Sequence, residues 1–255
     1  MATIRIVGPG RAGTSVASAL QASGHEVVGF VGSGDDPVDA ASGVDVLILA
    51  VPDRRIAEIA TRIKPVDSTV VMHLSGSQGL GVLAPHARRA SMHPLIPLPN
   101  SEVGATRLMA GATFAVAGDS AAESLAKSIG GRTVLVRDEN RAAYHAAACI
   151  AANHVVALMA QVERVAGSIG LELDVFLGLA RAALADVEAL GPEAALTGPA
   201  ARGDHATLAR HRAALDPSEL AGYDACVALA ERLAASGSVP ASGPVDAVSA
   251  PVEVA

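Results

Sequence analysis

Apolar and polar positions divide the chain into two parts with different periods. Over residues 1–136, short apolar runs alternate with amphipathic segments of helical period. The run Val44–Val51 is apolar throughout, which is typical of a strand buried on both faces of a parallel sheet. The predicted strands are Thr3–Val7, His25–Val31, Val44–Val51, Ser68–Leu74, Ala112–Ala117 and Thr133–Val136. The predicted helices between them are Thr14–Ala22, Arg54–Ile63 and Ser120–Ile129. This alternation predicts a parallel sheet with right-handed crossovers.

The remainder of the chain is rich in Ala and Leu and has helical periodicity. A long helix is predicted over residues 138–168, with Asp138 as its cap and Gly170 as its stop. A helix over 175–190 follows, and then two more, the last opened by Asp216 and Pro217. We therefore expect a dinucleotide-binding type of domain over 1–136, a helical domain over 137–235 and a disordered tail over 236–255. The fold class is an α/β N-terminal domain with a parallel doubly wound sheet, plus an all-α C-terminal domain.

Composition narrows the possible partners. Hydrophobic residues make up 51% of the chain, but aromatic residues only 2%, which disfavours base stacking on aromatic platforms. The formal net charge of −7 gives no chain-wide attraction to nucleic acid or to an anionic membrane, so neither is expected as a partner. Cys149 and Cys226 have neither disulfide nor metal-ligand spacing, and we expect two buried thiols and no metal site. No apolar run reaches about 18 residues and no signal peptide is evident, so a cytoplasmic location is expected.

The strongest motif is the glycine-rich turn Gly8-Pro9-Gly10-Arg11-Ala12-Gly13. It follows a predicted strand and opens a predicted helix, which is the context that a dinucleotide-binding Rossmann turn requires. Gly8 allows a tight turn, Gly10 lets a pyrophosphate approach the backbone, and Gly13 lets the helix pack against the strand. The N–H groups at the helix start then face the anion. A glycine-rich turn without a dinucleotide is the alternative.

The end of the second strand usually decides between NAD and NADP. No acidic residue stands at that strand end, so NADP is favoured, with Ser33 and Arg11 as candidate phosphate contacts. Asp35 reaching back to the ribose would reverse this preference, and NAD therefore stays possible. After the third strand, Val51-Pro52-Asp53 is expected to face the cofactor, although Asp53 is also a candidate cap of the following helix.

Two further residues follow strands or lie in loops. Ser75 ends the fourth strand and is a candidate contact to a substrate carboxylate or to the nicotinamide amide; a serine that satisfies its own turn is the alternative. His93 lies in the expected loop SMHPLIPLPN, where it either lines the cleft or bonds a nearby carbonyl.

The long helix carries His145, Cys149 and Asn153, which an α-helix would place within about 80° of one another. His145 is the candidate proton donor for reduction of a carbonyl or an imine, because imidazole titrates near neutrality. Asn153 would orient the substrate or the ribose. Hydrogen bonds between helices are the alternative explanation for these polar residues.

The loop Thr197–Asp204 holds the last candidates. Arg202 can clamp a carboxylate in bidentate fashion, and Thr197 is a candidate substrate contact. Asp204 is a further candidate catalytic residue, but it also stands where a cap of the next helix is expected.

Together these motifs resemble one family. They are GPGRAG at 8–13, VPD at 51–53, HLSG at 73–76, HPL at 93–95, YHAA at 144–147 with Asn153, and LTGPAARGD with Thr207 and His211. The family joins a Rossmann-like domain to a C-terminal helical domain of unknown function. It is similar to the 6-phosphogluconate dehydrogenase-like group, which includes β-hydroxyacid dehydrogenases, pyrroline-5-carboxylate reductases and ketopantoate reductases.

The resemblance implies an NAD(P)-dependent oxidoreductase that dimerises through its helical domain. Some bacterial members are associated with pantothenate synthesis, which makes ketopantoate, a small 2-oxo acid, the leading expected substrate. Ketopantoate reductases and β-hydroxyacid dehydrogenases place a helix Lys four residues before an Asn, whereas this chain has Cys149 before Asn153. The alternatives are therefore an imine reductase of the pyrroline-5-carboxylate type and a non-catalytic dinucleotide sensor.

Overall fold

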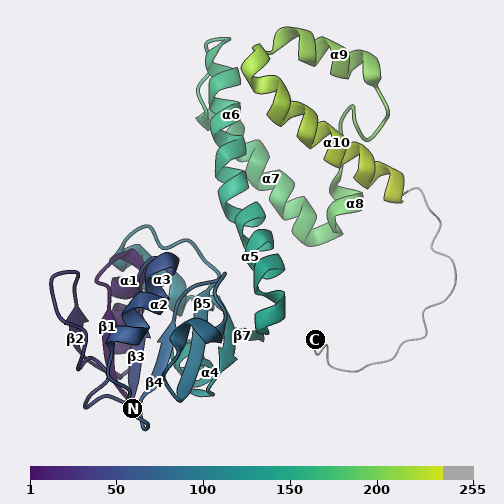
Figure 1. The fold of residues 1–255 in the computed structure, drawn as a ribbon. Helices are drawn as coiled ribbons and strands as arrows, with labels where there is room; N and C mark the ends of the chain where they lie inside the picture. The colour runs from purple at the N-terminus through teal and green to yellow at the C-terminus, as the bar shows by residue number, and fades with distance from the viewer. Residues whose placement is uncertain (238–255) are drawn as a thin grey trace, which may run out of the picture. The chain divides into compact units, whose positions relative to one another are not determined.

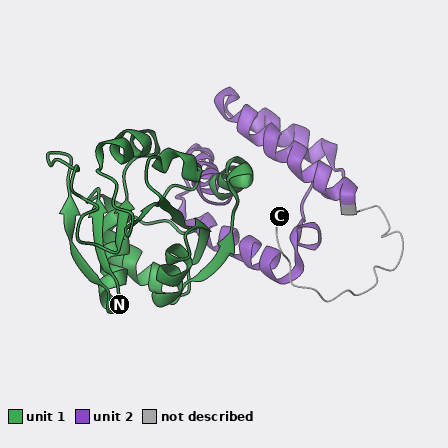
Figure 2. Ribbon diagram, turned by 60° about the horizontal axis from the view of Figure 1, so that its bottom comes forward, with its two compact units in different colours: residues 1–150, 252–255 green, residues 151–251 purple. Residues whose placement is uncertain are grey.

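The computed structural model describes residues 1–237, which form two compact units (Figure 2). The first unit runs from Met1 to Ile150 and the second begins at Ala151. The boundary lies beyond the expected position at residue 136, because side chains of the following helical turns bond to the sheet of the first unit. The unit is therefore defined by these contacts and not by where the strands stop.

The first unit is built on a seven-stranded sheet with the order β2-β1-β3-β4-β5-β6-β7 (Figure 1). Every pair of neighbours is parallel except β5 and β6, which are antiparallel. The strands are β1 Thr3–Val7, β2 Glu26–Val31, β3 Val46–Leu49, β4 Val70–His73, β5 Arg88–Pro94, β6 Thr113–Gly118 and β7 Arg132–Leu135. Since β1, β3, β4 and β5 run in the same direction, their carboxyl ends share one edge of the sheet.

Helices cover both faces of this sheet. On one face, α1 (Arg11–Ala22), α3 (Ser101–Met109) and α4 (Ala121–Ser128) bury residues such as Leu20, Leu108 and Leu125 against the strands. On the other face, α2 (Asp53–Arg62) and the 3-10 turn η1 (Leu80–Leu83) pack on Leu47, Leu49 and Val71. The apolar β3 run is buried on both sides, as its sequence predicts.

Two elements differ from the sequence expectation. The segment around His93 is strand β5 and not a loop, and α3 was not expected, although Asn100 caps it by accepting a hydrogen bond from Val103 N at 2.9 Å. The antiparallel step between β5 and β6 also departs from an all-parallel sheet. Hydrophobic periodicity does not predict whether neighbouring strands run parallel or antiparallel. The direction of β6 depends on how the chain returns to the sheet after α3.

The second unit is helical, as expected. Its elements are the π-helical turn η3 Ile150–His154, which starts on the last residue of the first unit, α6 Val155–Gly167, α7 Asp174–Leu190, α8 Pro192–Ala195, α9 His205–Ala214, η4 Pro217–Glu219 and α10 Leu220–Gly237. Asp216 caps η4 through Ser218 N at 2.9 Å, which confirms the predicted opening of the last helix. The buried side of this unit includes Glu219, whose carboxylate bonds to the Arg164 guanidinium. Both free cysteines, Cys149 in the first unit and Cys226 in the second, are half-buried rather than fully buried as expected.

The long predicted helix is helical over Asp138–Gly167 but is not a regular α-helix. The 3-10 turn η2 (Asp138–Asn140) leads into α5 (Arg141–Cys149), and the π-helical residues follow. Asp138 does not cap it; its carboxylate accepts a hydrogen bond from Leu80 N at 2.8 Å. This is the one described helix whose length and mean hydropathy (1.4) would allow it to cross a membrane. However, Arg141 and Tyr144 at its start bond to residues of strand β5 in the first unit.

The first two residues of the predicted tail are helical. Ser236 and Gly237 belong to α10, since the helix ends at Gly237. The rest of the predicted tail, residues 238–255, lies outside the described residues.

Candidate active site

The glycine-rich turn between β1 and α1 has the backbone geometry that its sequence predicts. Gly8 has a φ of +102°, and a Cβ there would lie 2.4 Å from the carbonyl oxygen of Ala50. A Cβ on Gly13 would lie 2.1 Å from the carbonyl oxygen of Gly8. By contrast, a Cβ on Gly10 would meet no atom within 4 Å. Gly8 and Gly13 are therefore required by the fold, whereas Gly10 faces open space where a ligand can approach.

The N-terminus of α1 is free to receive an anion. Gly10 is its N-cap residue, no side chain caps it, and the first turn holds no acidic residue. Pro9 and Arg11 are exposed, and Ala12 is half-buried. A pyrophosphate fits this arrangement, because free N–H groups and the positive end of the helix dipole point at it.

The loop after β2 bears on the choice of cofactor. Asp35 turns back toward the strand end, and its Oδ2 accepts a hydrogen bond from Gly32 N at 2.7 Å. Ser33, the predicted phosphate contact, is exposed in the same loop. A carboxylate thus lies at the end of β2, where an acidic group can accept a hydrogen bond from a ribose hydroxyl.

The ends of β3 and β4 are joined through Asp53. This residue follows Val51 and Pro52 and lies in the first turn of α2, but its side chain does not cap the helix. Instead, Asp53 Oδ2 accepts hydrogen bonds from Ser75 Oγ at 2.7 Å and from Ser77 Oγ at 2.6 Å. The prediction that Asp53 caps α2 is wrong, because its carboxylate instead accepts hydrogen bonds from two serine hydroxyls that follow the neighbouring strand β4.

Ser75 also satisfies its own turn. Its Oγ accepts hydrogen bonds from Ser77 N at 3.2 Å and from Gln78 N at 3.1 Å. The side chain is buried, and its hydroxyl hydrogen goes to Asp53. The alternative of a turn-stabilising serine is therefore the one that the structure favours.

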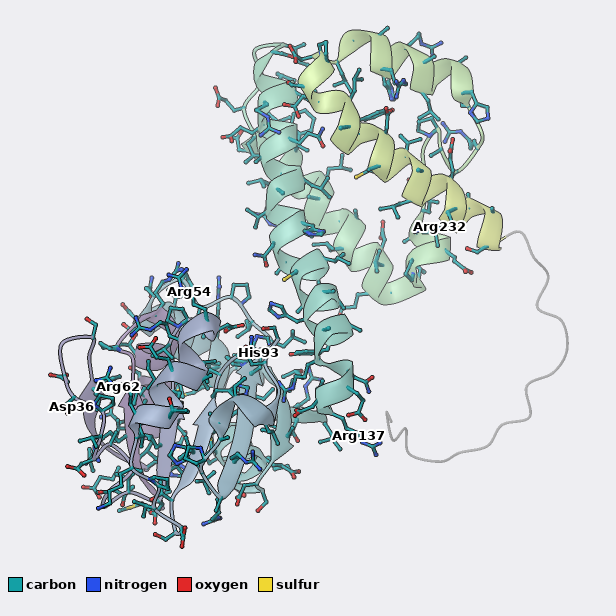
Figure 3. All side chains as sticks on the ribbon, viewed as in Figure 1. Asp36, Arg54, Arg62, His93, Arg137 and Arg232 are labelled. Atoms are coloured by element: carbon teal, nitrogen blue, oxygen red, sulfur yellow. The ribbon has the colours of Figure 1, made fainter. Side chains whose placement is uncertain are left out.

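Two imidazoles converge on the backbone of Gly76, in the middle of this turn. A Cβ on Gly76 would lie 2.7 Å from His145 Nδ1 and 2.9 Å from His93 Nε2. His93 Nδ1 lies 2.7 Å from the hydroxyl of Tyr144, and the two rings meet edge to face. His145 Nδ1 is buried without a hydrogen-bond partner among the described residues, and His145 Nε2 lies 3.6 Å from Cys149 Sγ. We call His93, Tyr144 and His145 the histidine cluster; Figure 3 shows His93 beside the start of α5.

A buried arginine lies behind the cluster. Arg141 is 1% exposed, its Nη2 bonds to Ser91 Oγ, and its Nη1 lies 3.4 Å from the carbonyl oxygen of Ser75. Its Nε has no hydrogen-bond partner among residues 1–237. The guanidinium thus links α5 to the ends of β4 and β5 and places a positive charge beneath the turn.

Burial and this charge keep the imidazoles of His73 and His93 neutral at neutral pH. Burial lowers the pKa of His93 to about 4, and His145 and Arg141 act in the same direction. Burial, followed by the charge of Arg141, likewise lowers the pKa of His73 to about 4. Burial raises the pKa of the Tyr144 phenol. At neutral pH the cluster therefore contains a neutral His93 and a protonated phenol.

The remaining predicted residues belong to the second unit. Asn153 lies exposed in the π-helical turn, and Thr197 and Arg202 are exposed in the loop before α9. Asp204 is the N-cap of α9, where its carboxylate accepts hydrogen bonds from Thr207 N at 3.0 Å and Thr207 Oγ1 at 2.7 Å. The predicted cap is confirmed, and its carboxylate is already occupied.

The sequence interpretation missed several members of the site. Tyr144, Ser77, Arg141 and Ser91 all bond within it, and none was proposed as a site residue. Tyr144 offered one signal, since it directly precedes His145 in a helix otherwise rich in alanine. Arg141 offered little, because an arginine near a helix start is usually a solvated residue.

Domain families match both parts of the chain. Residues 34–99 match the model of a Rossmann-like domain, and residues 112–230 match a domain of unknown function, DUF2520. Among curated proteins, no sequence matches the chain significantly.

Solved structures share the fold over nearly the whole chain. The candidate NADP oxidoreductase BF3122 from Bacteroides fragilis matches with a TM-score of 0.70 and 21% identity, covering 92% of this chain and 97% of that one. A pyrroline carboxylate reductase from Plasmodium falciparum with NADP bound matches with a TM-score of 0.58 and 10% identity, over 91% and 98%. A reductive aminase from Aspergillus terreus, in complex with NADPH and ethyl levulinate, matches with a TM-score of 0.64 and 17% identity, over 93% and 95%. The chain therefore combines a Rossmann-like domain with a DUF2520 domain, as the resemblance of its motifs predicted.

Proposed function

We propose that this protein is an NADP(H)-dependent reductase of a small carbonyl or imine substrate. One observation carries the proposal: the glycine-rich turn and the histidine cluster lie along the same carboxyl edge of the sheet. The strand order reverses between β1 and β3, and ligands of open α/β sheets bind outside the carboxyl ends of strands at such a reversal. A dinucleotide held there extends from the turn toward the adjoining strand ends.

The chain's own residues suit a dinucleotide. The N–H groups at the start of α1 would hold the pyrophosphate, and the open space at Gly10 admits it. When bound, the reduced nicotinamide supplies a hydride. NADP is the proposed cofactor, in line with the relatives that carry NADP or NADPH. NAD is the alternative, because the Asp35 carboxylate lies at the end of β2.

The histidine cluster offers a source for the proton that reduction of a double bond needs in addition to the hydride. Reduction leaves negative charge on the substrate oxygen or nitrogen, which a nearby O–H or N–H group must neutralise with a proton. Phenol and imidazole groups meet beside the Ser75–Ser77 turn, and the buried charge of Arg141 favours a developing anion there. His145, the proton donor assigned from sequence, belongs to this cluster.

The leading substrate class is a small 2-oxo acid, with ketopantoate as the first compound to test. This choice rests on the resemblance of the motifs. A cyclic imine of the pyrroline-5-carboxylate type is the second candidate, since a pyrroline carboxylate reductase and a reductive aminase share the fold. The proposed carboxylate contacts Arg202 and Thr197, and the proposed positioning residue Asn153, belong to the second unit and stay predictions.

We further propose that two copies associate through the helical unit. Large apolar side chains on its helices are open to solvent in the single chain, including Val156 (70% exposed), Val175 (61%) and Leu179 (71%). Exposed apolar surface of this kind is typical of a subunit interface. Light scattering coupled to gel filtration should report a dimer for the native chain and a monomer for Leu179→Asp; a monomeric native chain would refute the proposal.

The proposed function is tested by titrating the protein with NADPH and NADH while following nicotinamide fluorescence, then adding ketopantoate or pyrroline-5-carboxylate. Oxidation of the bound cofactor when one of these substrates is added would identify both the cofactor and the substrate. Tight binding without oxidation by any carbonyl or imine compound would favour the dinucleotide sensor instead. Absence of dinucleotide binding would overturn the proposal as a whole.

A further inference from the structure

We propose that Tyr144 delivers the proton to the reduced substrate and that His93 returns a proton to Tyr144. This inference rests on the proposed function, and it moves the proton-donor role from His145 to the neighbouring residue. Tyr144 would be the catalytic residue, because its hydroxyl would touch the substrate atom. His93 would be a positioning and relay residue.

The geometry of the hydroxyl is the first argument. Tyr144 Oη has a single hydrogen-bond partner among the described residues, His93 Nδ1 at 2.7 Å. A phenol hydroxyl both donates and accepts, so one hydrogen bond to His93 leaves the hydroxyl able to form a second one with a ligand. The edge-to-face contact between the rings, with centroids 5.6 Å apart, fixes the phenol in this orientation.

His145 is less suited to the same role. Its Nδ1 is buried against the backbone of Gly76 and has no partner among residues 1–237, so a substrate atom has no room beside it. Its Nε2 faces the thiol of Cys149 at 3.6 Å. The half-buried phenol of Tyr144 is therefore the better placed donor.

The groups around His93 keep its imidazole neutral, with a single ring proton, at neutral pH. The ionisable groups that face it are Tyr144, His145, His73, Arg141 and Asp53. Burial is the largest effect, and together with His145, Arg141 and His73 it outweighs the Asp53 carboxylate and lowers the pKa of His93 to about 4. At neutral pH the imidazole therefore carries one proton, and the Tyr144 phenol keeps its own because burial raises its pKa.

The proton balance closes with water as the source. The electron pair of the substrate double bond goes to oxygen or nitrogen, which forms a bond to the Tyr144 proton as the phenol O–H breaks. With its resting proton on Nδ1, His93 then gives that proton to the phenolate while its Nε2 takes a proton from water, and the hydroxide that remains passes to solvent. Proton exchange with solvent returns the ring proton to Nδ1 before the next turnover. Since His93 gives one proton and gains one, it ends neutral, and the pair needs no strongly basic or acidic group.

The first test is Tyr144→Phe in the full chain, which removes only the hydroxyl. We expect kcat to fall about 100-fold or more, the usual contribution of a general acid, while the NADPH dissociation constant stays within about twofold. Tyr223→Phe is the matched control, because Tyr223 is the chain's other tyrosine and also bonds a histidine, His211 Nδ1, at 2.8 Å. It should keep the native kcat.

The second test does not depend on turnover. Side-chain nitrogen NMR of the ligand-free protein should show the His93 resonances shifted in Tyr144→Phe, with the His86 resonances unchanged because that ring bonds Ala60 O elsewhere. Unshifted His93 resonances would overturn the pairing on which the relay depends.

The outcomes separate the two proposals. Native kcat in Tyr144→Phe, with an active wild type, overturns the Tyr144 role and leaves the reductase standing. Loss of kcat together with loss of NADPH binding also overturns it, because the hydroxyl would then be structural. A wild type that binds NADPH but reduces no carbonyl or imine overturns the proposed function and the Tyr144 role together.

Discussion

Asp53 and Ser75 are joined by a hydrogen bond of 2.7 Å between carboxylate and hydroxyl, across the ends of two neighbouring strands. Ser77 donates to the same oxygen at 2.6 Å. Asp53 thereby holds the turn on which the imidazoles of His93 and His145 converge. Asp53 follows β3, whereas Ser75 lies 22 residues further along the chain. The position of Asp53 in the sequence therefore does not reveal that it stabilises the turn after β4.

Replacing Asp53 with Ala should lower the free energy of unfolding by about 1–3 kcal/mol. The buried Ser75 hydroxyl would lose a charged acceptor, and unsatisfied buried donors carry a penalty of this size. Urea unfolding followed by circular dichroism measures it. Ser77→Ala, which removes only a half-buried hydroxyl, is the matched control and should cost less. An Asp53→Ala protein as stable as Ser77→Ala would contradict this role.

Gly10→Ala should leave the fold intact but weaken dinucleotide binding at least about tenfold. Gly10 has an ordinary φ of −78°, and a Cβ there meets no protein atom within 4 Å, so stability should be preserved. The added methyl would occupy the space through which a pyrophosphate approaches the backbone. Fluorescence titration with NADPH measures the loss. Gly178→Ala also adds a methyl in open space, in helix α7 and outside the proposed cofactor site, and this variant should bind NADPH normally.

Asp35→Ser should shift the cofactor preference further toward NADPH, by about tenfold in the ratio of the two dissociation constants. The carboxylate at the end of β2 repels a 2′-phosphate and can accept a hydrogen bond from a ribose hydroxyl. Parallel titrations with NADPH and NADH give the ratio. Asp36→Ser is the control, since Asp36 is 72% exposed and pairs with Arg62 at 3.6 Å (Figure 3). An unchanged ratio in Asp35→Ser would mean that the adenosine ribose binds elsewhere.

Stability should fall as the pH drops from about 6.5 toward 4. The pKa of His73 is lowered from 6.5 to about 4 in the folded chain, so the unfolded chain binds more protons in this window. The stabilisation is complete above about pH 6.5 and is lost as the pH falls toward 4. For His73 alone this linkage amounts to about 2 kcal/mol between about pH 7.5 and pH 5.

Urea unfolding at several pH values checks this, with His73→Gln as the variant. Glutamine does not titrate, so the dependence on pH should flatten by about the His73 contribution, whatever the change in absolute stability. His93, whose pKa is also lowered to about 4, would retain part of the slope. The same slope in both proteins would show that His73 is accessible to protons in the folded state.

The sequence by itself determined the elements whose signals are local. Apolar runs predicted six of the seven strands of the first unit, all except β5. The glycine-rich turn predicted the space at Gly10, and Asp204 and Asp216 predicted two helix caps. Each of these features depends on residues within a few positions of one another, so the sequence predicts it without the tertiary structure. The glycines Gly8 and Gly13 are required by backbone contacts within the same turn and the adjoining strand.

Only the tertiary structure decided what the site contains. His93, Tyr144 and Arg141 come together because β5 runs parallel to β4 and α5 bonds to the ends of both, and neither strand direction nor helix docking is encoded in hydrophobic periodicity. The partner of Asp53 is likewise chosen by the adjacency of β3 and β4. Hydrogen bonds between residues distant in sequence depend on which strand ends become neighbours, and that order is fixed only when the whole sheet assembles.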